Sequence, residues 1–65
     1  MIVYDRLWIT MAKHGITQYK LGTHGIGHAT ISRLKNNQPV NTETLNKLCT
    51  ILNCNIEDIA EYKPN

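Results

Sequence analysis

The chain has 65 residues, the size of one small domain, which leaves no room for a separate ligand-sensing or catalytic domain. Hydrophobic residues make up 42% of the sequence, enough for a folded core and too many for a disordered chain. No apolar run approaches the roughly 20 residues of a membrane-spanning helix, and the first residues lack the basic start and apolar core of a signal peptide. We therefore expect one domain over residues 1–65, cytoplasmic and without membrane contact.

The net charge is only +2, but the charges are unevenly distributed along the chain. No acidic residue occurs between Arg6 and Thr42, a stretch that holds most of the lysines and arginines and all the histidines. From Glu43 onward the acidic residues outnumber the basic ones. A one-sided basic surface is typical of proteins that bind polyanions, although a solvated face with an accidental asymmetry would have the same composition.

The starts of four helices share one pattern, in which an apolar residue precedes the cap and another follows five positions later. The apolar pairs are Ile16 and Leu21, Ile26 and Ile31, Val40 and Leu45, and Cys54 and Ile59. This hydrophobic staple fixes the angle at which the chain enters a helix. The caps between are Thr17, Asn41 and Asn55, which are strong caps, and Gly27, which is weaker.

The ends of the helices complete the prediction of an all-α domain. Gly15 and Asn53 suit the left-handed residue that commonly ends a helix. We expect five helices at about residues 4–14, 18–24, 28–36, 42–53 and 56–62. The period of 3.6 residues predicts a core built from Leu7, Trp8, Met11, Leu45, Leu48, Cys49, Leu52, Ile56, Ile59 and Ala60. The two chain ends, around Ile2-Val3 and after Glu61, could form a short strand pair within or between chains.

The segment from Gly25 to Leu34 is a tight glycine turn that leads into a short helix. Another short helix, beginning at Thr17-Gln18, precedes it. Two short helices joined by a turn that contains glycine are what a chain needs to present one helix to a DNA major groove. The spacing therefore predicts a helix-turn-helix with a recognition helix at about residues 28–36.

These pieces, taken in order, resemble the phage-repressor (lambda repressor/Cro, or XRE) family of helix-turn-helix domains, in its short stand-alone form. The matching segments are Tyr4–Trp8, Gly15–Leu21, Gly25-Ile26, Ile31–Asn37, Val40–Thr42, Thr44-Leu45, Leu48–Cys54 and Ile56–Ile59. The resemblance covers nearly the whole chain and implies a five-helix DNA-binding domain. One departure is that the second helix is short, with Gly22 inside it and His24 where relatives place an apolar residue.

The resemblance also implies a role for particular positions. Thr17 and Gln18 would touch phosphate at the start of the second helix. His28, Ala29, Ser32 and Arg33 would form the outward face of the recognition helix. Asn36 and the start of the fourth helix, at Asn41 and Thr42, would hold the DNA backbone.

General chemistry agrees with these roles. Free N–H groups and a partial positive charge at helix N-termini suit phosphate. The guanidinium of Arg33 matches guanine O6 and N7, and the methyls of Ala29 and Thr30 suit a thymine methyl. Lys20 and Lys35 add general attraction. For Arg33 the alternative is an ion pair with Asp5 or Glu57, and for His28 and Gln18 it is an ordinary place at a helix start.

The remaining polar and aromatic residues have structural interpretations. Cys49 and Cys54 do not have C-x-x-C spacing, and we expect two reduced, buried thiols. The histidines share no ligand spacing with the cysteines, so no metal or other cofactor is expected. His14 and His24 are interpreted as structural or surface residues, and Trp8 and Tyr19 as core residues rather than stacking platforms.

The sequence thus predicts a sequence-specific regulator of transcription, repressor-like, that binds double-stranded DNA as a homodimer. One small module buries too little DNA surface for tight binding, and two copies on adjacent half-sites would correct this. The alternative is a protein-interaction adaptor or antitoxin-like partner that uses the same fold without reading bases. An enzyme is not expected, because no catalytic constellation occurs, and no small-molecule effector is evident.

Overall fold

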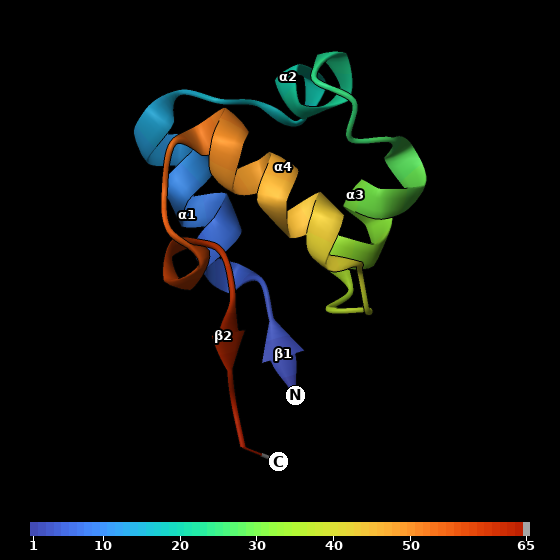
Figure 1. The fold of residues 1–65 in the computed structure, drawn as a ribbon, viewed down its shortest axis with the longest axis vertical. Helices are drawn as coiled ribbons and strands as arrows, with labels where there is room; N and C mark the ends of the chain where they lie inside the picture. Colours follow the sequence, from blue (N-terminus) through green and yellow to red (C-terminus); the bar gives the residue numbers. More distant parts are fainter. Residues whose placement is uncertain (65) are drawn as a thin grey trace.

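A helical body and a projecting two-stranded ribbon make up the computed structural model, which describes residues 1–64 (Figure 1). The helices are α1 (Asp5–His14), α2 (Gln18–Thr23), α3 (His28–Lys35) and α4 (Thr42–Leu52). A 3-10 turn, η1 (Ile56–Asp58), follows α4, and the strands β1 (Ile2–Val3) and β2 (Glu61–Tyr62) pair antiparallel. The described residues therefore form a mostly helical domain of four α-helices with a short strand pair.

The predicted caps are present where side chains were expected to supply them. The Thr17 hydroxyl accepts the backbone N–H of Lys20 at 3.2 Å, at the start of α2. The Asn41 side chain accepts the backbone N–H of Thr44 at 2.8 Å, at the start of α4. Gly27, at the start of α3, has an extended backbone but no side chain to accept a bond. Local sequence therefore fixes where these helices begin.

All four α-helices end in the same type of turn, and each of these turns contains one residue of positive φ. In each turn the N–H of the next residue bonds back to a carbonyl five positions earlier, which is the Schellman arrangement. These bonds run from Ile16 to Met11 (2.9 Å), Ile26 to Leu21 (3.0 Å), Gln38 to Arg33 (2.8 Å) and Cys54 to Cys49 (3.1 Å). The residues of positive φ are Gly15, Gly25, Asn37 and Asn53.

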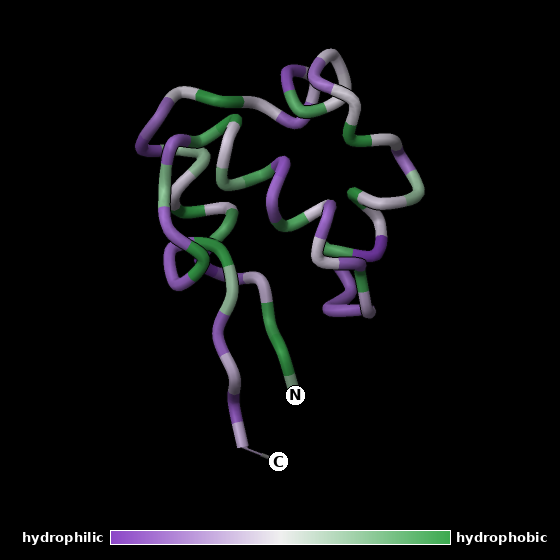
Figure 2. Tube along the Cα trace, viewed as in Figure 1, coloured by the Kyte–Doolittle hydropathy of each residue, from purple (hydrophilic) through white to green (hydrophobic). Residues whose placement is uncertain are grey.

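One core joins the helices and is filled mainly by leucine and isoleucine. Figure 2 shows that hydrophobic and hydrophilic residues alternate in short stretches along the chain. The buried residues are Val3, Tyr4, Leu7, Met11, Leu21, Ile26, Ile31, Leu34, Leu48, Leu52 and Ile59. Trp8, Leu45, Cys49 and Ala60 pack against this core while partly exposed. Most predicted core positions are confirmed, and each staple places its second apolar residue in or against the core.

The prediction of a fifth helix at residues 56–62 is wrong. Asp58 accepts the N–H of Asn55 at 3.0 Å and closes a capping box, but the helix stops after the short turn η1. The chain then extends, and Glu61 and Tyr62 pair with Val3 and Ile2. Pairing with β1 thus competes successfully with further helix. Because one turn gives no helical face, Ile56 is 48% exposed instead of buried.

The predicted pairing of the two chain ends is confirmed, and it occurs within one chain. Within β1, Val3 is buried, whereas Ile2 is 47% exposed. Arg6 of α1 ties the ribbon to the helices through an ion pair with Glu61 (3.4 Å) and a bond to the carbonyl of Glu57 (3.1 Å). In the described part of the chain, no helix has the length and apolar character needed to cross a membrane.

Candidate nucleic-acid interface

The helices α2 and α3 and the turn between them form the candidate interface. Leu21 of α2, Ile26 of the turn, and Ile31 and Leu34 of α3 are all buried in the core. These four side chains hold both short helices against the body, so the opposite face of each helix must lie on the surface. The turn itself passes through Gly25 at a φ of 96°, a conformation that glycine adopts without strain.

The predicted contact residues lie on the surface of this region, with one exception. Thr30 is partly buried, because it lies beside the core side of α3. The exposed ones are Thr17, Gln18, His28, Ala29, Ser32, Arg33, Lys35, Asn36, Asn41 and Thr42. That these residues contact DNA stays a prediction.

Arg33 has no acidic partner in residues 1–64. The ion pairs of the described chain join Arg6 to Glu61 and Lys63 to Asp5. The alternative interpretation, in which Arg33 pairs with Asp5 or Glu57, therefore does not hold in this structure. The guanidinium keeps its donors available for a ligand.

Three of the residues predicted to contact phosphate form side-chain hydrogen bonds within the chain. The hydroxyl of Thr17 and the side-chain oxygen of Asn41 cap their own helices. The amide of Asn36 donates to the carbonyl of Ser32 at 2.9 Å. The two capping bonds of Thr17 and Asn41 engage the third N–H of each helix and leave the earlier backbone N–H groups of α2 and α4 available for an anion.

A pocket of about 520 Å³ opens between α2 and α3, next to the predicted contact residues. It is lined by Gln18, Tyr19, Gly22, Thr23, Ile26, Gly27, His28 and Ile31. A Cβ at Gly22 or Gly27 would meet nothing within 4 Å, so both glycines border the open space of the pocket. Gln18 of α2 and His28 of α3 thus share one depression in the surface.

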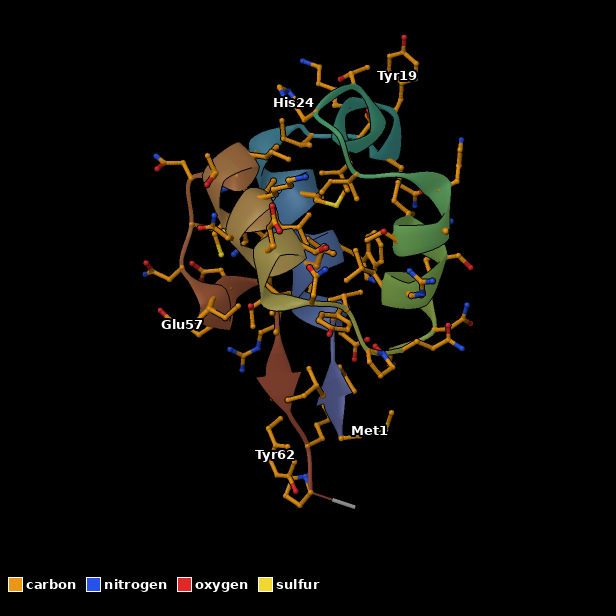
Figure 3. The ribbon with its side chains drawn as sticks, turned by 45° about the vertical axis from the view of Figure 1, so that its right-hand side comes forward. Met1, Tyr19, His24, Glu57 and Tyr62 are labelled. Atoms are coloured by element: carbon orange, nitrogen blue, oxygen red, sulfur yellow. The ribbon has the colours of Figure 1, made fainter. Side chains whose placement is uncertain are left out.

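Tyr19 is a residue that the sequence interpretation missed. It was expected in the core, but it is 80% exposed and points away from the body at α2 (Figure 3). The signal was present in the sequence, because Tyr19 precedes the buried Leu21 by two residues and so lies about 200° away around the helix. His14 and His24 are both exposed, which agrees with their interpretation as surface residues. Trp8 is partly buried against the core.

The two cysteines lie away from this interface, in and after α4. Both are free thiols and partly buried. Burial, with smaller contributions from Cys49, Asp58 and Glu57, raises the pKa of the Cys54 thiol. Within residues 1–64, no three His, Cys, Asp or Glu side chains lie together in a way that could hold a metal ion.

Comparison with known proteins gives a consistent result. The model of the Cro/C1-type helix-turn-helix DNA-binding domain matches residues 6–65. The crystal structure of the transcriptional regulator VanUg is similar, with a TM-score of 0.89 and 28% sequence identity, over 98% of this chain and 87% of that one. No curated protein is significantly similar in sequence. The chain belongs to the Cro/C1-type helix-turn-helix DNA-binding domains.

Proposed function

We propose that the protein is a transcriptional regulator that binds double-stranded DNA at a specific sequence, with α3 in the major groove. The observation that carries this proposal is the exposed face of α3, on which Arg33 has no partner while Ile31 and Leu34 anchor the other face. The family and the similarity to VanUg, itself a transcriptional regulator, support it. Residues 1–65 would act as one DNA-binding unit.

In this proposal the contacts divide into reading and positioning. His28, Ala29, Ser32 and Arg33 face the base edges, with Arg33 directed at guanine and the methyl of Ala29 at thymine. Thr30 is partly buried, so only the exposed part of its side chain would be able to contact a base. The positioning contacts are the N-terminus of α2 at Thr17 and Gln18, the N-terminus of α4 at Asn41 and Thr42, and the side chains of Lys35 and Asn36.

We also propose that the protein binds as a homodimer. A single helix of eight residues reaches about four base pairs, and a module of this size buries too little DNA surface for high affinity. Two copies related by a twofold axis would read two half-sites about 34 Å apart. The DNA site would then be a palindrome.

Random-site selection on the immobilised protein, followed by mobility-shift titration of the selected site, tests the function. We expect a palindromic sequence. R33A should weaken binding about tenfold to a hundredfold, and R33K should recover little, because lysine lacks the two-pronged donor geometry. K47A, which removes one exposed charge from α4 outside the proposed contacts, is the matched control and should change binding little.

A different result would favour the adaptor or antitoxin-like alternative. If no sequence is enriched, if R33A binds DNA as the unsubstituted protein does, and if binding hardly depends on salt, the exposed face of α3 does not read bases. The proposal would then be wrong.

A further inference from the structure

We propose that Cys49 and Cys54 form a reversible disulfide, which ties the last turn of α4 to the segment that leads into η1. The bond would form by exchange with a small disulfide such as oxidised glutathione. The pair lies at the end of α4 opposite to Asn41 and Thr42, which contact phosphate in the proposed function. The inference therefore goes beyond DNA binding and concerns a separate site of thiol modification.

The turn at the end of α4 holds the two cysteines together. The N–H of Cys54 donates to the carbonyl of Cys49 at 3.1 Å, and Asn53 between them has a left-handed φ of 49°. In this Schellman arrangement the side chains at the two ends of the backbone bond commonly contact each other. Cys49 and Cys54 therefore occupy two positions that the backbone itself brings side by side.

The surroundings of Cys54 show that the two side chains are neighbours. Burial is the main cause of the raised pKa of Cys54, and Cys49 raises this pKa further, both electrostatically and through a side-chain hydrogen bond. A disulfide requires Cβ atoms about 3.8 Å apart, and two thiols that already share a hydrogen bond need little movement to reach that spacing. Both cysteines pack against the core while partly exposed, so neither is sealed from solvent.

The same turn ends the other three helices, where the equivalent pairs cannot form a covalent bond. These pairs are Met11 and Ile16, Leu21 and Ile26, and Arg33 and Gln38. The first two pairs are apolar and lie in or against the core. At the end of α4 two thiols take that place, since a free cysteine packs as a small hydrophobic residue. The fourth turn thus has the packing of the first two together with the chemistry of a dithiol.

The disulfide would form in two exchange steps. In the first, the sulfur of one cysteine loses its proton to solvent and attacks oxidised glutathione, whose S–S bond breaks; a mixed disulfide forms, and one glutathione thiolate leaves and takes up a proton. In the second, the sulfur of the other cysteine attacks the mixed disulfide, the internal bond forms, and the second glutathione leaves in the same way. Two cysteine thiols are oxidised by two electrons, and one oxidised glutathione is reduced to two glutathione thiols.

The fold should favour the second step. In the unfolded chain, four flexible residues separate the two cysteines, and closing this loop costs conformational entropy. In the folded chain the turn has already closed it. The effective concentration of one thiol at the other should therefore be about tenfold higher in the folded protein than in the unfolded one. By linkage the disulfide stabilises the fold by the same factor, which would raise the thermal midpoint by about 5–10 °C.

Equilibration of the full-length protein with glutathione tests this inference. The protein is held at a series of ratios of reduced to oxidised glutathione at about pH 8, where more thiolate is present than at neutral pH and exchange is faster. Rapid alkylation with N-ethylmaleimide and mass spectrometry then distinguish free thiols, mixed disulfides and the internal disulfide. The same series in enough urea to unfold the chain gives the reference. We expect the folded protein to close the internal bond at a roughly tenfold higher ratio of squared reduced to oxidised glutathione.

C49S and C54S are the matched controls, because each retains one thiol that can form a mixed disulfide but no internal bond. Thermal melts of the oxidised and reduced unsubstituted protein, followed by circular dichroism, check the expected gain in stability. The inference is overturned if the folded protein closes the bond no more readily than the unfolded one, if the oxidised form melts below the reduced form, or if oxidation links chains to one another instead. A failure of specific DNA binding in the reduced protein would overturn the proposed function and leave this inference standing.

Discussion

Arg33 shows how a single residue becomes available for recognition. The stretch around it contains no acidic residue between Arg6 and Thr42, and the acids of the described chain that form ion pairs, Asp5 and Glu61, engage Lys63 and Arg6 instead. Arg33 is therefore exposed without an internal partner. Because a guanidinium is weakly hydrated, the desolvation free energy that such an arginine loses on contacting a base edge is small.

Gly22 can be replaced by alanine without a steric clash. It lies inside α2, its φ is not positive, and a Cβ there would meet nothing within 4 Å. Because glycine in a helix costs about 0.5–1 kcal/mol relative to alanine, G22A should stabilise the protein. We expect the thermal midpoint, followed by circular dichroism, to rise by about 2–8 °C.

The comparison for this variant is G25A, since Gly25 has a φ of 96° that alanine adopts only with strain. G25A should lower the midpoint. A G22A protein that melts below the unsubstituted one would show that α2 needs glycine for a reason other than backbone or space.

At the scale of the elements, the starts of the helices could be predicted because staples and caps are local. Thr17 and Asn41 cap their helices as expected. The end of the chain could not be predicted in this way. Whether residues after Asn55 continue as helix depends on a strand some 60 residues earlier in sequence, which a local period cannot detect. The misplacement of Ile56 follows from that error.

The candidate interface was predictable to a similar extent. Burial of Ile31 and Leu34 follows from the staple and the helical period, and it determines which face of α3 is exposed. Tyr19 was misplaced although its position two residues before the buried Leu21 puts it on the opposite side of α2, so the helical period could have predicted its exposure. The side-chain bond from Asn36 to the Ser32 carbonyl could not be anticipated, since it depends on how α3 ends.

The start of α4 provides a test that separates folding from DNA binding. N41A removes the acceptor for the Thr44 N–H, and we expect it to destabilise the protein by about 1 kcal/mol. N41D keeps an acceptor and places a negative charge at a helix N-terminus, which is favourable for folding. The same charge would repel a phosphate.

N41D should therefore melt near the unsubstituted protein while binding the selected DNA site more weakly. Thermal melts and mobility-shift titrations at one salt concentration give both quantities. Unchanged DNA affinity in N41D would remove the N-terminus of α4 from the proposed phosphate contacts.

At the scale of the whole molecule, the proposed dimer should determine how steeply DNA binding depends on salt. With about four to six phosphate contacts in each copy, the logarithm of the binding constant should fall with the logarithm of salt with a slope of about −4 to −5 for one copy and about −7 to −11 for two. Titrations of the palindromic site and of an isolated half-site, each over a range of salt, distinguish the two cases. Equal slopes on both would contradict binding as a dimer.

The ribbon that joins Met1 to Lys63 also has a consequence for the order of folding. Its closure encloses nearly the whole chain, so its loop-closure entropy exceeds that of every local helix turn, and long-range contacts of this kind form late. A ribbon of two residues in each strand has few bonds to protect it and is the first part to open in local fluctuations. The helices that hold α3 would thus be in place before the two ends of the chain meet, and would remain so when those ends separate.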